Sequence, residues 1–100
     1  MALQVQTKMT NVIVTLKIMP ESPEVNLDDI QVKALELIKN FAGEGDTKVE
    51  QEPVAFGLKS INIIFIMDEA KGSTEALEDQ IQDIEGINSV EVTDVRRAVG

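Results

Sequence analysis

The sequence of 100 residues contains no cysteine, no histidine, no tryptophan and no tyrosine. Without cysteine, the chain can form neither a disulfide framework nor a thiol nucleophile. Without cysteine and histidine together, the common nucleophile–base pairs and the usual zinc sites cannot be built. The missing residue types therefore exclude large classes of hydrolases and zinc proteins, and we expect no catalytic residue, no metal site and no cofactor.

Long hydrophobic runs are also missing. The longest apolar run covers residues 63–67, which is far too short to cross a bilayer. Residues 1–8 carry no apolar signal-peptide core, so we expect a cytoplasmic protein. We also expect residues 1–8 to be a flexible extension, with Met9 as an alternative start, and residues 9–100 to form a single domain.

Positive charge is scarce. The chain carries 9 Lys and Arg residues against 18 Asp and Glu residues, a formal net charge of −9. This balance disfavours direct binding of nucleic acid, because phosphate recognition needs a clustered basic surface. The aromatic side chains are Phe41, Phe56 and Phe65 alone, too few and too scattered to stack RNA bases. The acidity indicates a basic protein partner, or it serves solubility alone.

Two segments in the first half have clear periodicity. Residues 11–18 alternate between apolar and polar side chains, and a further apolar residue on the outer face, Ile13, indicates a strand inside a sheet. Residues 27–41 repeat apolar side chains at helical spacing, between an N-cap at Asn26 and the terminating glycines Gly43 and Gly45. The apolar faces comprise Val12, Val14, Leu16 and Ile18 for the strand, and Leu27, Ile30, Ala34, Leu37, Ile38 and Phe41 for the helix.

The second half predicts two more strands, a helix and a last strand. Residues 47–56 are highly charged and contain Pro53, which favours an edge strand. Residues 58–67 are apolar on both faces, which favours a central strand. The landmarks of the helix that follows are a cap at Ser73 or Thr74, a buried stripe of Ala76, Leu77, Ile81 and Ile84, and an end at Gly86.

Residues 88–95 form the last expected strand, with Val90 and Val92 facing inward. The order is then strand, helix, strand, strand, helix, strand, which is the ferredoxin-like split β-α-β arrangement. We expect an α+β fold with a four-stranded antiparallel sheet and two helices on one face. In that topology the first and third strands are central and the second lies at an edge, which agrees with their polarity.

Phe56 and the adjacent Arg96 and Arg97 are the two features that suggest an interaction. An aromatic side chain beside a hairpin glycine can insert into a partner, although isolated large apolar residues usually pack inward, and we expect that of Phe56. Two adjacent arginines at a chain end usually serve solubility. Their functional interpretation is a positive charge carried on a rigid strand end toward an anionic or metal-vacated site.

Several stretches together resemble the nucleotide-exchange domain of the translation elongation factor 1-beta family, and most of all its short archaeal form. They are Val-Thr-Leu-Lys-Ile-Met-Pro at 14–20, Pro-Val-Ala-Phe-Gly-Leu at 53–58, Asp-Glu-Ala-Lys-Gly at 68–72 and Val-Glu-Val-Thr-Asp-Val-Arg-Arg at 90–97. The resemblance covers roughly residues 11–97. No single stretch is diagnostic, but their order and spacing are specific.

The resemblance implies a ferredoxin-like fold and a partner, the GTPase elongation factor 1-alpha, from which GDP is released. It implies that Phe56 inserts into the GTPase and that a basic residue near the C-terminus, best matched by Arg97, reaches the magnesium site. The eukaryotic pattern has lysine there, and arginine is bulkier and planar. The partner-binding residues implied in this way are Ala55, Phe56, Gly57, Lys59, Asp94, Arg96 and Arg97.

Two alternatives come from other classes of protein. A small ferredoxin-like regulatory domain could bind a metabolite or metal and self-associate through a sheet edge. A carboxylate-dependent enzyme could use a pair of acids for proton transfer, and acids are frequent between Glu75 and Asp83, where a solvated helix face is the ordinary interpretation. The fold alone does not choose among these functions.

Overall fold

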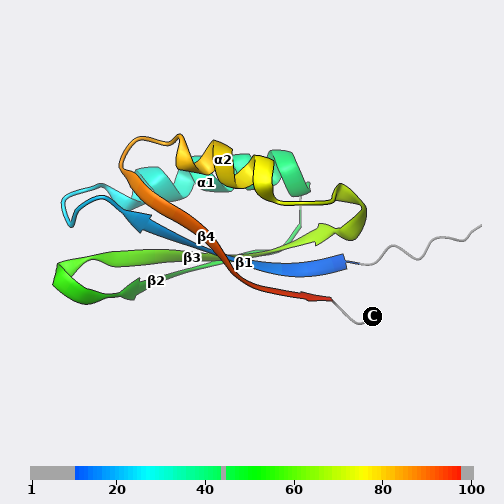
Figure 1. Cartoon of the computed structure of the whole chain (residues 1–100), viewed down its shortest axis with the longest axis horizontal. Coiled ribbons are helices and arrows are strands. Elements are labelled where there is room, and N and C mark those ends of the chain that lie inside the picture. Colours follow the sequence, from blue (N-terminus) through cyan, green and yellow to red (C-terminus); the bar gives the residue numbers. More distant parts are fainter. Residues whose placement is uncertain (1–10, 44, 98–100) are drawn as a thin grey trace, which may run out of the picture.

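The computed structural model describes residues 11–43 and 45–97. The expected extension at residues 1–8 and the alternative start at Met9 lie outside these ranges. Four strands form one antiparallel sheet in the order β2-β3-β1-β4, and both helices lie on one face of it (Figure 1). The α+β, ferredoxin-like expectation is confirmed. The elements are β1 (Asn11–Pro20), α1 (Leu27–Ala42), β2 (Thr47–Pro53), the 3-10 turn η2 (Ala55–Gly57), β3 (Lys59–Asp68), the 3-10 turn η3 (Glu69–Lys71), α2 (Glu75–Gln82) and β4 (Ile87–Arg97).

The central strands β1 and β3 pair directly, so that Val14 lies opposite Phe65 and Leu16 opposite Ile63. Their alternate side chains face the helices and are buried, as the period of two predicts. The core is made by Val12, Val14, Leu16, Ile18, Ile30, Ala34, Ile38, Ile61, Ile63, Phe65, Met67, Leu77, Ile81 and Ile87.

The ends of α1 follow the sequence signals. The Asn26 Oδ1 accepts a hydrogen bond from the Asp29 backbone N–H at 3.2 Å, which satisfies one of the free donors of the first turn. Gly43 has a φ of 88°, and its N–H donates to the Lys39 carbonyl at 2.9 Å. Both expected caps of this helix are confirmed. Neither helix in the described part of the chain is long and apolar enough to cross a membrane.

Helix α2 is shorter than expected. Leu77 and Ile81 are buried, but Ala76 is exposed, because a helix of 8 residues presents only a narrow stripe to the core. The helix ends at Gln82, so the expectation that Gly86 closes it is wrong. Gly86 instead lies in the turn before β4 with a φ of 96°, where a Cβ would come within 2.9 Å of Val25 Cγ1.

Strand bounds differ from the expected ones at two functional positions. β2 ends at Pro53 rather than at residue 56, because proline cannot donate to the ladder and the chain then turns through η2. β2 is an edge strand and β3 is central, as expected. β4 continues to Arg97, because β1 offers pairing partners as far as Val12. Arg96 and Arg97 therefore lie within the strand rather than after it.

A β-bulge interrupts the pairing of β1 with β4. Thr15 pairs with Asp94 and Leu16 pairs with Val92, so Thr93 is an extra residue in β4. The Thr93 Oγ1 donates to the Thr15 carbonyl at 3.4 Å. Beyond the bulge, the register places Val95 and Arg97 on the helix-covered side of the sheet, and Asp94 and Arg96 on the open side.

Candidate functional site

Phe56 projects from the turn that joins β2 to β3. Its side chain is 92% exposed, so the expectation that it packs inward is wrong. Figure 1 shows this turn (residues 55–57) at the end of the hairpin, beyond the helices that cover the sheet. The turn is closed by two backbone hydrogen bonds, from Val54 N to Leu58 O at 2.8 Å and from Leu58 N to Ala55 O at 3.2 Å.

The backbone of Phe56 is itself unusual. It has φ 63° and ψ 30°, and it is the one non-glycine residue with positive φ in the described ranges. The next residue, Gly57, also has a positive φ of 76°. The left-handed conformation costs an ordinary residue roughly 1–2 kcal/mol, and such strain is found mainly where function requires it. The exposed ring and the strained backbone coincide at one residue.

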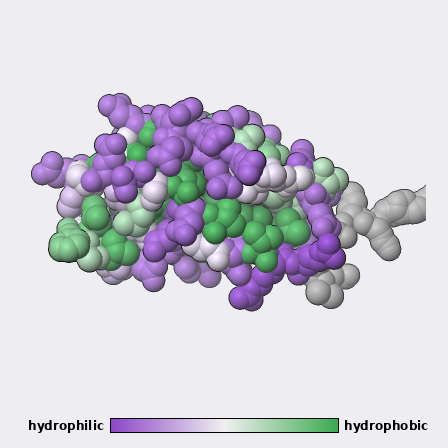
Figure 2. Space-filling view, in the orientation of Figure 1, coloured by the Kyte–Doolittle hydropathy of each residue, from purple (hydrophilic) through white to green (hydrophobic). Residues whose placement is uncertain are grey.

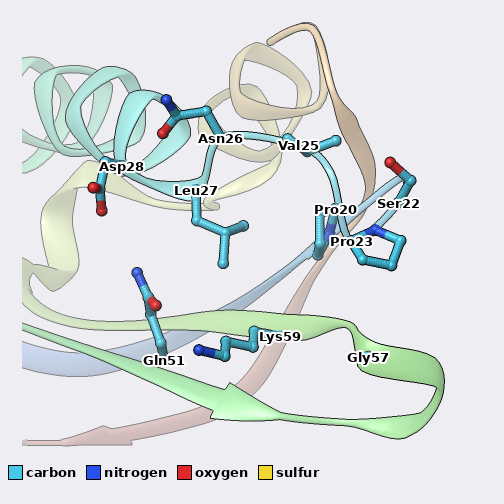
Figure 3. Close-up of a pocket in the computed structure, with 10 residues that line it drawn as sticks. All are labelled: Pro20, Ser22, Pro23, Val25, Asn26, Leu27, Asp28, Gln51, Gly57 and Lys59. Atoms are coloured by element: carbon cyan, nitrogen blue, oxygen red, sulfur yellow. The ribbon is translucent and has the colours of Figure 1, made fainter.

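A cleft of about 280 Å³ lies beside this turn, between the loop that follows β1 and the strands β2 and β3. Figure 3 shows the side chains of Leu27, Gln51 and Lys59 directed into it. A Cβ on Gly57 would lie 3.9 Å from Pro23 Cγ, so the loop packs closely against the Phe56 turn. Of these residues, sequence reasoning singled out Gly57 and Lys59. It missed Leu27 and Gln51, which only the tertiary fold brings to the cleft.

The C-terminal half of β4 carries the two arginines. The Arg97 Nη2 lies 2.7 Å from Glu69 Oε2 in η3, and the Arg96 Nε lies 2.8 Å from Asp94 Oδ2. Arg97 is opposite Val12 and Arg96 is opposite Ile13, so their side chains leave opposite faces of the sheet. The two guanidinium groups are therefore presented to a partner from opposite faces of the sheet. Glu69 is a charged neighbour that sequence reasoning missed, because it lies 28 positions from Arg97 in the chain.

The expected site residues fall into two groups at opposite ends of the sheet. Ala55, Phe56, Gly57 and Lys59 lie at the end where Pro53 pairs with Lys59. Asp94, Arg96 and Arg97 lie at the other end, where Val12 pairs with both Met67 and Arg97. From Lys59 to Met67 the strand advances roughly 26 Å at ~3.3 Å per residue. The structure therefore does not bring the two groups together, and one compact site cannot include both.

The rest of the described surface offers little to a metal ion or a small molecule. No group of three or more His, Cys, Asp or Glu residues within the described ranges could hold a metal ion. Four clefts of the described surface measure about 270–350 Å³, at the lower limit of cavities that enclose small molecules. An exposed aromatic ring on a closed turn and a cation at a strand end are suited to contact with another protein.

Comparisons with known proteins agree with this interpretation. Residues 13–98 match the family of EF-1 guanine nucleotide exchange domains. An elongation factor 1-beta from Methanothermobacter thermautotrophicus is 43% identical over 89 residues, which cover 89% of this chain and 98% of the relative. An elongation factor 1-beta from Nanoarchaeum equitans is 42% identical over 83 residues, covering 83% of this chain and 100% of the relative.

Among solved structures, a de novo designed protein named Foldit4 has a similar fold. It matches with a TM-score of 0.61 at 19% identity, over 90% of this chain and 98% of the designed one. At that identity the match shows the fold alone. The family match and the archaeal relatives decide the function: the chain belongs to the EF-1 guanine nucleotide exchange domain family and is a nucleotide exchange factor of translation elongation.

Proposed function

We propose that this chain releases GDP from the GTPase elongation factor 1-alpha by contacting it at two separate places, the Phe56 turn and the Arg97 end of β4. The observation that carries the proposal is Phe56, an aromatic side chain 92% exposed on a left-handed backbone. Membership of the exchange-domain family supports the choice of partner. The separation of the two ends implies a broad contact rather than a single pocket.

The Phe56 end supplies apolar binding energy. A phenylalanine that leaves water for a partner's pocket is the kind of side chain that dominates protein interfaces. The closed turn fixes its backbone before contact, so little conformational entropy is lost on binding. Ala55 and Gly57 are small and allow close approach of the partner. Lys59, which lines the adjacent cleft, adds a positive charge at the same end of the sheet.

The Arg97 end supplies the effect on nucleotide. A GTPase holds the β-phosphate of its nucleotide with the P-loop and a magnesium ion. At that place the Arg97 guanidinium would pair with carboxylates of the GTPase and would so weaken the binding of magnesium and, with it, of nucleotide. Binding of the exchange factor and binding of nucleotide then oppose each other, and thermodynamic linkage makes the opposition reciprocal.

This mechanism requires no bond chemistry from the chain. It acts by shifting binding equilibria, and in this sense it is not an enzyme. Its net charge of −9 favours docking to a basic surface of the GTPase. The corresponding place of action is the cytoplasm, where translation elongation takes place.

The test is stopped-flow release of a fluorescent GDP analogue from elongation factor 1-alpha. The chain, its Phe56→Ala and Arg97→Ala variants and a matched control, Val32→Ala, are compared; Val32 is 59% exposed on α1 and belongs to neither group of expected site residues. Wild type and control should accelerate release equally, and both site variants should lose most of the acceleration. Acceleration that survives both site changes removes the site assignment and keeps the exchange function. No acceleration by the wild type removes the choice of partner.

A further inference from the structure

A groove of about 310 Å³ lies between the C-terminal half of β4 and the segment that leads into α2. We call it the β4 groove. Its register is defined: Val95 lies opposite Val14, and Val12 lies opposite Met67. It is lined on one side by Val12, Val14, Met67 and Val95, and on the other by Glu69 and residues 72–74.

The groove exposes apolar surface that the elements within residues 11–43 and 45–97 do not cover. Val95 is 57% exposed, one of three large hydrophobic side chains so exposed in the described part of the chain, together with Phe56 and Val32. Helix α2 begins only at Glu75 and leaves this part of β4 uncovered. Figure 2 shows apolar surface between α2 and the C-terminal half of β4.

The polar side chains along the opposite wall already have hydrogen-bond or ion-pair partners within the chain. The Ser73 Oγ accepts from the Glu75 N–H at 3.0 Å, and the Thr74 Oγ1 donates to Glu78 Oε2 at 2.7 Å. The Glu69 carboxylate is paired with Arg97 at 2.7 Å. An occupant therefore meets an apolar surface and few uncommitted hydrogen-bonding groups. The volume is at the lower limit for a small-molecule site, which fits one side chain better than a metabolite.

We infer that the β4 groove binds an apolar side chain of the GTPase, beside the contact made by Arg97. The inference rests on the proposed function and extends its C-terminal contact from a single cation to a surface. The groove is continuous with that contact, because Val95 and Arg97 occupy alternate positions on the same side of β4. The ion pair between Arg97 and Glu69 joins β4 to η3, the two elements that border the groove. A partner segment that reaches the guanidinium from this side also meets Val95.

The experiment compares Val95→Thr with Val32→Thr. Threonine keeps the shape and β-branching of valine and replaces one methyl group by a hydroxyl, and the two valines are similarly exposed, at 57% and 59%. Two quantities are measured, the dissociation constant for elongation factor 1-alpha by calorimetry and the maximal rate of GDP release. Val95→Thr should weaken binding about tenfold, because its hydroxyl is buried without a partner in the complex. The maximal rate should stay unchanged, because Phe56 and Arg97 are intact, and Val32→Thr should change neither quantity.

The outcomes separate the inference from the proposed function. If the wild type does not bind the GTPase, the proposed function and the inference both fail. If the wild type binds and releases GDP but Val95→Thr behaves like Val32→Thr, the inference alone is wrong. Val95→Ile, which stays apolar, should bind within about twofold of the wild type, and weakening equal to that of Val95→Thr also overturns the inference.

A measurement on the unsubstituted chain avoids any dependence on the folding of the variants. Backbone amide resonances of Gly72, Ser73 and Val95 should shift when unlabelled GTPase is added to the isotope-labelled chain. The resonance of Val32 is the internal control and should stay in place. Binding without any shift at the β4 groove excludes it as a contact.

Discussion

The two ends of the sheet present their functional side chains in different ways. At one end Phe56 has its position set by the backbone, through two consecutive positive φ values and a closed turn. At the other end Arg97 lies on a regular strand, and its guanidinium is held by a side-chain ion pair with Glu69. The backbone conformation of the turn fixes the position of Phe56, and an ion pair fixes the position of the Arg97 guanidinium. The first should therefore respond to changes in backbone freedom, and the second to charge and salt.

The sharpest test of the Phe56 end compares Phe56→Ala with Phe56→Gly. Both remove the ring and should lower the efficiency of GDP release roughly 30-fold or more, as expected for an interface hot spot of about 2 kcal/mol. Glycine also relieves the left-handed strain, so Phe56→Gly should be about 1 kcal/mol more stable than Phe56→Ala. Stopped-flow release and urea unfolding measure the two effects. Equal stability of the variants contradicts the assignment of strain to this residue.

Arg97→Gln should lower the efficiency of GDP release about tenfold, through the loss of charge-assisted hydrogen bonds. Acceleration by the wild type should weaken as salt is added, and this dependence should be shallower in Arg97→Gln and unchanged in Phe56→Ala. Arg96→Gln is the matched control, because its side chain leaves the opposite face of the sheet. A larger effect from Arg96→Gln than from Arg97→Gln reverses the assignment of the two arginines.

Gly57→Ala tests whether the backbone of the turn matters apart from the ring. A Cβ at φ 76° is strained although its nearest neighbour would be 3.9 Å away, so the loss of stability should be about 1 kcal/mol. Gly43→Ala is matched, with φ 88° and no atom within 4 Å, and lies outside the Phe56 turn. Both variants should unfold at lower urea concentration, and only Gly57→Ala should slow GDP release. Equal release rates would mean that the ring does not need this turn.

Glu69→Gln should have the smallest effect on stability. The side chains of the pair are 70% and 44% exposed, so their mutual stabilisation should be less than about 1 kcal/mol. A double-mutant cycle with Arg97→Gln, followed by urea unfolding, measures the coupling. A coupling free energy between Glu69 and Arg97 well above that value would mean that the ion pair holds Arg97 as firmly as the turn holds Phe56. The two ends of the sheet would then not differ in this respect.

Much of this fold could be predicted from periodicity, and much of the site could not. The alternation in β1 and the caps of α1 are local signals, and both are confirmed. The local pattern did not predict the exposure of Phe56, because a non-glycine residue in the left-handed region is rare and leaves no sequence mark; only the family resemblance implied an exposed ring. The ion pair of Arg97 could not be predicted either, because Glu69 lies near it only in the tertiary structure.

The family resemblance found the two ends, but it did not show how they are arranged. It assigned Ala55, Phe56, Gly57 and Lys59 together with Asp94, Arg96 and Arg97 to one partner. The sheet register then separates these groups by most of the length of β3. Their roles in binding stay predictions, and their positions at opposite ends are the constraint that any docking arrangement must satisfy.

The extra residue Thr93 decides which residues at the end of β4 face the helix side of the sheet. Counting by twos from Val90 and Val92 gives even numbers on the helix side, which would send Asp94 and Arg96 there. The bulge changes the count to odd numbers and brings Val95 and Arg97 to that side instead. The position of the bulge in β4, and not the chemistry of either residue, thus decides which arginine faces the helix side of the sheet. In a relative with one residue more or fewer at this point, the neighbouring side chain in the sequence would face the helix side of the sheet instead.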